Sequence, residues 1–144
     1  MFQTILVAVD ESDAAKSALR YAVELAGAGG GKVILCNIID VAKLVAVAGY
    51  ETPYPADTIE IMRNNSKQIL DDGRKMCNES GVTCTVLTDE GDACEQILRI
   101  AKEENVDLIA LGTHGRQGLS RLFIGSVAEG VLRRADVPVL VTRE

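Results

Sequence analysis

The chain contains three short segments that are almost continuously apolar, at residues 4–9, 33–39 and 107–111. Strands that are buried on both faces have this pattern, because a strand with one face in water alternates apolar and polar residues instead. Two further segments, 82–87 and 137–142, are rich in β-formers and bring the expected strands to five. We therefore predict a parallel sheet with helices on both faces.

Helical patterns separate the predicted strands. Between the first two strands, apolar residues recur at helical spacing while charged residues occupy the opposite side, as in an amphipathic helix. Each later helix shows a capping-box pattern, in which a residue that binds the first N–H groups is followed three positions later by glutamate. These patterns begin at Asp57, Asp92 and Ser126.

Strand and helix alternate from end to end, which is typical of one doubly wound α/β domain that covers residues 1–144. With 47% hydrophobic residues, the chain has enough apolar side chains for one buried core. The expected strand order is 3-2-1-4-5. In such sheets, ligands bind beyond the carboxyl ends of the strands, at the point where the order reverses. Asp10, after the first strand, and Gly112, after the fourth, are therefore expected to line the ligand crevice.

The charge balance of the chain narrows the expected partners. The chain contains 15 Lys plus Arg and 21 Asp plus Glu, which gives a formal charge of −6. This charge repels nucleic-acid backbones and anionic membranes, so we expect neither as a partner. The apolar run near the N-terminus stops at Asp10 and has no basic region before it, unlike a secretory signal. No apolar stretch reaches the roughly 18 residues of a transmembrane helix, and we expect a cytoplasmic protein.

The four cysteines show no motif of their own. Neither a CxxC pair nor the Cys/His spacing of a zinc site is present. Three of the four lie in apolar periodic patterns, where a small thiol packs well. A packing role is therefore the expectation, with thiol chemistry as the alternative. The four are Cys36, Cys77, Cys84 and Cys94.

A glycine-flanked polar loop, GTHGRQGLSRLFIGS, follows the fourth predicted strand and runs into a helix. A phosphate needs backbone N–H donors that it can approach without a Cβ in the way, and a helix N-terminus adds unpaired donors and a favourable dipole. Gly112, Gly115 and Gly125 meet the first need, and the helix that opens at Ser126 meets the second. Arg116 can add a charge-assisted contact. The loop therefore predicts a phosphate site.

Other roles for these residues stay open. Ser126 with Glu129 also fits a helix cap that needs no ligand, and Asp10 fits a cap for the helix that begins near Ser12. His114 is the sole histidine, which leaves no His-based metal cluster or Ser/His/Asp triad. We expect His114 to lie beside the ligand. The long connection at 41–56 fits a lid, a partner surface or a short irregular helix.

The spacing Gly112-x2-Gly115-x9-Gly125-Ser126 resembles the loop motif of the nucleotide-binding branch of the universal stress protein family. The flanking segments are similar as well, and the resemblance covers essentially the whole chain. It implies a Rossmann-like domain of the adenine-nucleotide-hydrolase type. The segments that carry it are ILVAVDESDAA, VILCNIID, DEGDACEQI, DLIALGTHG and ADVPVLVTR.

Position by position, the resemblance implies that the N–H groups of Gly115, Gly125, Ser126 and Val127 hold the phosphates of ATP, or of ADP or AMP. It also implies that the Ser126 hydroxyl reaches a terminal phosphate oxygen. Asp10 is implied as a ligand of Mg2+ or Mn2+ through water. The remaining positions implied around the nucleotide are Ala8 and Val9 near the ribose and phosphates, Ile38 at the adenine edge, Leu111 in the base pocket, Gly112 leaving room for ribose, and His114, Arg116 and Ala128 along the loop and helix.

Two positions depart from the family pattern. Ala8-Val9 replaces the Pro-Thr of some members, and Ala128 stands where a hydroxyl residue can contact phosphate. Neither change removes a backbone donor, and losing one hydroxyl contact costs on the order of 1 kcal/mol, which is less than tenfold in affinity.

The expected function is that of an ATP-binding regulatory module of the stress response, with little or no hydrolysis, because the chain offers no evident base or nucleophile. One alternative is a protein-interaction module of the same fold that uses no nucleotide. The other is an ATP-using transferase or hydrolase. A fifth strand at the sheet edge also predicts a homodimer through residues 137–142.

Overall fold

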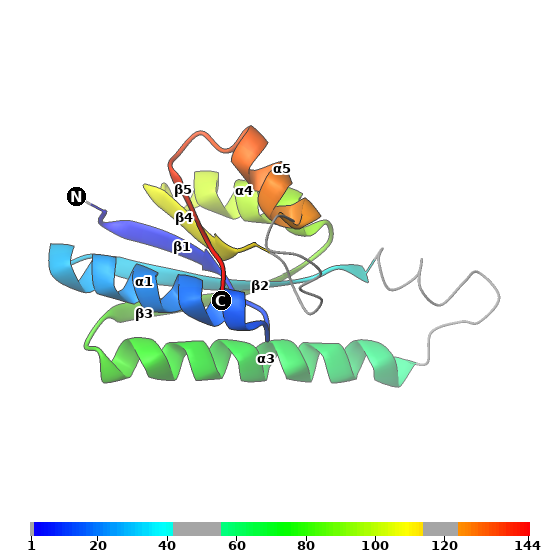
Figure 1. Ribbon diagram of the computed structural model, residues 1–144. Helices are drawn as coiled ribbons and strands as arrows, with labels where there is room; N and C mark the ends of the chain where they lie inside the picture. The colour runs from blue at the N-terminus through cyan, green and yellow to red at the C-terminus, as the bar shows by residue number, and fades with distance from the viewer. Residues whose placement is uncertain (1, 42–55, 114–123) are drawn as a thin grey trace.

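The computed structural model describes residues 2–41, 56–113 and 124–144, and within them strands alternate with helices (Figure 1). The labels below follow Figure 1. The strands are β1 (Thr4–Ala8), β2 (Lys32–Ile39), β3 (Thr83–Glu90), β4 (Leu108–Gly112) and β5 (Val139–Thr142). The helices are α1 (Asp13–Gly29), α3 (Ala56–Glu79), α4 (Ala93–Glu103) and α5 (Ser126–Arg134).

All five strands form one parallel sheet in the order β3-β2-β1-β4-β5. This is the predicted order, and the prediction of a doubly wound sheet is confirmed. The chain moves outward from β1 to β3, then returns to place β4 on the other side of β1. Helices α1 and α3 cover one face of the sheet and α4 and α5 cover the other (Figure 1).

The core consists of two apolar layers, one on each face of the sheet. Successive residues of a strand point to opposite faces, so Ile5 and Val7 of β1 pack toward α1 and α3, while Leu6 packs toward α4 and α5. All three are fully buried. A strand enclosed on both sides must be apolar at every position, which is why its sequence shows no alternation.

Helix starts follow the predicted caps in part. Asp92 caps α4, because its carboxylate accepts a hydrogen bond from the N–H of Glu95 at 2.9 Å. Helix α3 begins at Ala56, so Asp57 lies inside its first turn and is not the cap. A carboxylate there still interacts favourably with the helix dipole. No helix of the described residues is both long and apolar enough to cross a bilayer.

The first turn of α1 lies directly against the ends of β4 and β5. A Cβ at Gly112 would come within 2.8 Å of the carbonyl carbon and Cβ of Ala14 and of the nitrogen of Ala15. The Thr142 hydroxyl, which is buried, donates to the Ala14 carbonyl at 2.8 Å. The missing side chain of Gly112 therefore makes room for α1. Its implied role toward a ribose stays a prediction.

We expect Gly112→Ala to lower the free energy of unfolding by about 1–3 kcal/mol, because the new methyl group collides with the backbone of α1. Urea denaturation measures this loss. Gly27→Ala is the matched control, since a Cβ there meets its nearest atom, Val82 Cγ2, at an ordinary 3.6 Å. It should be neutral or gain up to about 1 kcal/mol from helix propensity. Equal denaturation midpoints for the two variants would contradict the close packing at Gly112.

Candidate functional site

The strand order reverses between β1 and β4, and the candidate site lies there. The two strands run side by side, with Ala8 opposite Leu111. After β1 the chain enters α1 on one face of the sheet, and α5, which follows β4, lies on the other face (Figure 1). The N-termini of two helices therefore flank the carboxyl edge of the same two strands. This is the crevice that the strand order predicts.

Five of the implied nucleotide positions lie on one face of this edge. Ala8, Ile38 and Leu111 lie on three neighbouring strands and pack with the core layer under α4 and α5. Val127 and Ala128 of α5 belong to the same layer. Ala128 is 1% exposed, so its side chain points into the core. Its backbone N–H, and not its side chain, is the group that α5 can offer to a ligand at this position.

Val9 lies on the opposite face of the sheet from Ala8 and Leu111. Its side chain packs in the core layer under α1 and α3. Its backbone groups are also engaged. The Val9 N–H donates to the Cys36 carbonyl at 2.9 Å, and the Asn37 side-chain amide donates to the Val9 carbonyl at 2.7 Å. Val9 thus fixes the end of β1 to β2. The structure does not bring its side chain to the face that Ala8 and Leu111 share.

The N-terminus of α5 has unpaired donors. Gly125 is the N-cap, with an extended backbone and no side-chain cap. Its carbonyl accepts from the N–H of Glu129 at 2.9 Å. The N–H groups of Ser126, Val127 and Ala128 have no acceptor in the part of the chain that the structure describes, as expected for a first turn without a cap. These donors and the helix dipole favour an anion here.

The capping role considered for Ser126 is wrong. The helix begins at Ser126 itself, so its hydroxyl lies in the first turn, one position after the capping residue. Glu129 does not complete a capping box, and its carboxylate instead pairs with Arg133 at 2.7 Å along the exposed side of α5. The exposed Ser126 side chain is therefore not needed to start the helix.

Asp10 is likewise not the cap of α1. Ser12 is the N-cap, and its hydroxyl accepts from the Ala15 N–H at 3.1 Å. One carboxylate oxygen of Asp10 accepts from the Ser12 N–H at 2.7 Å, which shapes the turn before the helix. Asp10 is exposed at the carboxyl edge of the sheet. No group of three or more His, Cys, Asp or Glu residues is placed to hold a metal within the described ranges, and the metal role of Asp10 stays a prediction.

Two residues that position the site were missed by sequence reasoning. Thr113 is buried, its N–H donates to the Thr142 carbonyl at 2.8 Å, and its carbonyl accepts from the N–H of Gly125. It thereby joins β5 to the start of α5. Asn37 holds the end of β1, as described above. The signals for them were a threonine directly after a strand and a lone amide inside an otherwise apolar strand.

Comparison with known proteins identifies the family of the chain. The model of the universal stress protein family matches residues 1–143. The chain belongs to the universal stress protein family. It is 32% identical to universal stress protein YxiE of Bacillus subtilis over 148 residues, which cover 99% of this chain and 100% of the relative.

Solved structures of universal stress proteins share the fold. The structure of MJ0577 of Methanocaldococcus jannaschii superposes with a TM-score of 0.85 at 28% identity, and the match covers 100% of this chain and 97% of that one. A family member from Arabidopsis thaliana, solved with AMP bound, gives a TM-score of 0.69 at 20% identity and covers 99% and 92%. At this identity, the second likeness concerns the fold alone.

Three implied site positions of this universal stress protein, His114, Gly115 and Arg116, lie outside the described residues, as does most of the 41–56 connection. A hollow of about 290 Å³ does occur elsewhere, between α1 and β5. Ser17, Arg20 and Tyr21 line one side and residues 140–144 the other. It contains none of the implied nucleotide positions. The site at the strand reversal therefore rests on the backbone donors and strand ends described above, not on this hollow.

The free energy of unfolding tests the assignment of Ser12 as the N-cap of α1. Ser12→Ala should lower the free energy of unfolding by about 1 kcal/mol, because the Ala15 N–H loses its acceptor. Asp10→Asn keeps an acceptor for the Ser12 N–H and should cost only a few tenths of a kcal/mol. Thermal or urea unfolding of both variants measures the difference. A larger loss for Asp10→Asn than for Ser12→Ala would contradict the assignment.

Proposed function

We propose that this universal stress protein binds an adenine nucleotide at the carboxyl edge of the sheet, between β1 and β4, and acts in the cytoplasm as a regulatory module of the stress response. ATP is the proposed ligand, with ADP and AMP as alternatives. The observation that carries the proposal is the first turn of α5 beside the strand reversal, which has no side-chain cap and whose N–H groups find no acceptor among the described residues. The AMP bound to the Arabidopsis relative supports an adenine nucleotide in this fold.

The proposed contacts divide between backbone and apolar groups. The N–H groups of Ser126, Val127 and Ala128 bind phosphate oxygens, with Gly115 adding a donor from the preceding loop. Ala8, Ile38 and Leu111 belong to the same core layer. We therefore assign their apolar and backbone atoms to the ribose and base. The carboxylate oxygen of Asp10 that does not bind the Ser12 N–H holds a Mg2+ or Mn2+ ion through water, and the ion neutralises phosphate charge.

We propose binding with little or no hydrolysis. Phosphoryl transfer to water needs a residue that orients the attacking water and cations that stabilise the transition state. The chain has a single histidine, and one oxygen of Asp10 is already engaged by the Ser12 N–H.

Ser126→Pro tests the α5 site directly. Proline suits the first position of a helix, and the extended backbone of Gly125 (ψ 158°) suits the residue before a proline. The substitution therefore removes the N–H of residue 126 and keeps the helix. Calorimetric titration with Mg2+ and ATP should show an affinity loss of roughly tenfold to a hundredfold, as for one hydrogen bond to a charged group. Ser126→Ala, which keeps the N–H, should lose less than tenfold.

Each outcome of this titration decides between functions. Bound nucleotide must first be removed from the purified protein. Equal affinities of Ser126→Pro and wild type would place the nucleotide elsewhere. No saturable binding by folded, nucleotide-free protein would favour the interaction module that uses no nucleotide. ATP turnover above the buffer rate that Ser126→Pro abolishes would favour the transferase or hydrolase.

We also propose that two copies of the chain pair through β5. This strand lies at the sheet edge and has β4 as its neighbour. The Pro138 carbonyl accepts from Ile109 of β4, and the Thr142 carbonyl accepts from Thr113, directly after β4. Because bonding groups alternate along a parallel strand, the N–H and C=O groups of Val139 and Val141 point away from β4. An edge with free backbone groups and apolar side chains is a surface for pairing with another chain.

Val141→Pro should shift the protein from dimer to monomer in sedimentation velocity at micromolar concentration. The proline removes an outward N–H and leaves the hydrogen bonds to β4 in place. The midpoint of thermal unfolding serves as the folding control. A wild-type protein that sediments as a monomer, or a dimer that Val141→Pro leaves intact, would contradict pairing through residues 137–142.

A further inference from the structure

Two cysteines from different elements meet at the end of the sheet opposite to the candidate nucleotide site. Cys77 lies in the last turns of α3, and Cys84 is the second residue of β3. The chain reverses between them in a tight turn, in which the Val82 N–H donates to the Cys77 carbonyl at 2.9 Å and Gly81 has a φ of +69°. Both side chains consequently face the layer between α3 and the sheet.

The two thiols differ in their surroundings. Cys77 is 0% exposed and belongs to the core, while Cys84 is half-buried and packs against the edge of that core. The Cys84 thiol donates to the Thr85 carbonyl at 3.8 Å. The interaction between the Cys77 and Cys84 thiols raises the pKa of Cys77, as does its burial. It lowers the pKa of Cys84, helped by the positive charge of Arg74 and opposed by burial.

The other two cysteines supply internal controls. Cys36 is fully buried, and burial together with the charge of Asp89 raises the pKa of its thiol to about 12. Burial also raises the pKa of the half-buried Cys94 thiol. Neither thiol interacts with a second cysteine within the described parts of the chain. A thiolate reacts with oxidants and a buried thiol does not, so the four cysteines are not equivalent.

We propose that Cys77 and Cys84 form a peroxide-reactive dithiol that closes reversibly into a disulfide between α3 and β3. Cys84 is the thiol that reacts first, because it is the more accessible of the two. Cys77 is the resolving thiol, because it belongs to the apolar layer against which Cys84 packs. A resolving thiol beside an accessible thiolate is the arrangement that oxidation-sensing cysteines share.

The proposed chemistry needs a hydroperoxide as the oxidant. The Cys84 thiolate attacks one peroxide oxygen, the O–O bond breaks, and the leaving oxygen takes a proton from water, which gives Cys84 sulfenic acid and an alcohol or water. The Cys77 sulfur then attacks the Cys84 sulfur. The S–O bond breaks, the departing hydroxide takes the Cys77 proton as water, and the disulfide forms. Two thiols are oxidised by two electrons and one peroxide is reduced by two.

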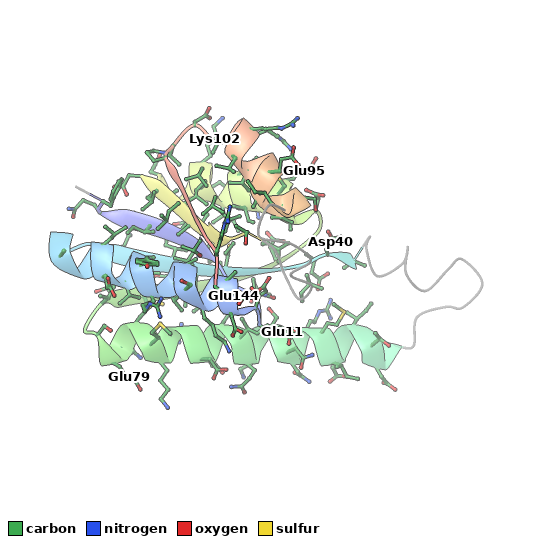
Figure 2. The ribbon with its side chains drawn as sticks, in the orientation of Figure 1. Glu11, Asp40, Glu79, Glu95, Lys102 and Glu144 are labelled. Carbon is green, nitrogen blue, oxygen red and sulfur yellow. The ribbon has the colours of Figure 1, made fainter. Side chains whose placement is uncertain are left out.

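The dithiol is remote from the proposed nucleotide contacts. Cys84 pairs in register with Val33 at the amino end of β2, whereas the nucleotide contacts lie at the carboxyl ends of the strands. In Figure 2, Glu79 marks the end of α3 near Cys77, and Glu11 and Asp40 mark the opposite end of the sheet. Oxidation of the pair therefore does not depend on the nucleotide site.

Peptide mapping of the full-length protein tests the proposal. Reduced protein is treated with a small excess of hydrogen peroxide, alkylated, digested and examined by mass spectrometry. We expect one intramolecular link, between the peptides of Cys77 and Cys84, that dithiothreitol reverses, while Cys36 and Cys94 remain alkylated. Cys77→Ser should accumulate a sulfenic acid at Cys84 that dimedone traps. Cys84→Ser should leave Cys77 reduced, and Cys94→Ser is the matched control that links like wild type.

A surface substitution tests the same site without touching the core. Arg74→Gln should slow the linkage severalfold without lowering the unfolding temperature, because it removes the charge that stabilises the Cys84 thiolate. The proposal is overturned if folded wild type forms no Cys77–Cys84 link, if Cys36 or Cys94 oxidises first, if the link joins two chains, or if Arg74→Gln links as fast as wild type. Peptide mapping of the wild-type protein tests the Cys77–Cys84 link even where a serine variant fails to fold.

Discussion

The close contact between Gly112 and the first turn of α1 determines the geometry of the carboxyl edge of the sheet. Because Gly112 has no Cβ, the backbone of Ala14 can lie on β4, and Thr142 then donates a hydrogen bond to it from β5. Thr113, the next residue after β4, bonds to Thr142 in turn. The same Thr113 holds Gly125 and thereby fixes where α5 begins. One small residue is thus the first member of a series of contacts that ends at the proposed phosphate donors.

The sequence was sufficient for the architecture and for part of the capping. The apolar runs predicted the strands to within a few residues, because burial on both faces of a parallel strand leaves a pattern that polar residues seldom interrupt. Asp92 was also predicted correctly as a cap. Ser126 was not, because a capping box in sequence does not distinguish the capping residue from the first residue of the helix. The extended backbone of Gly125 makes that distinction, and only the fold reveals it.

The features that sequence could not supply depend on segments far apart in the chain. Thr113 and Asn37 act through hydrogen bonds to residues on other strands, and nothing in their local pattern indicates those partners. Gly112 was expected to face a ligand, but its contact with α1 appears only when β4 and α1 are packed together. Cys77 and Cys84 form no recognised motif either. They meet because a helix ends, a tight turn follows, and a strand returns along the same layer.

The donors at the start of α5 belong to the main chain, and this has a consequence for how such a protein diverges. Every amino acid except proline supplies the same N–H group, so point mutations can replace the side chains at this turn without deleting the donors. What must be inherited is the position of the helix, which the core and a few small residues specify. Distant relatives can therefore lose nearly all recognisable likeness at this turn and still present the same donors.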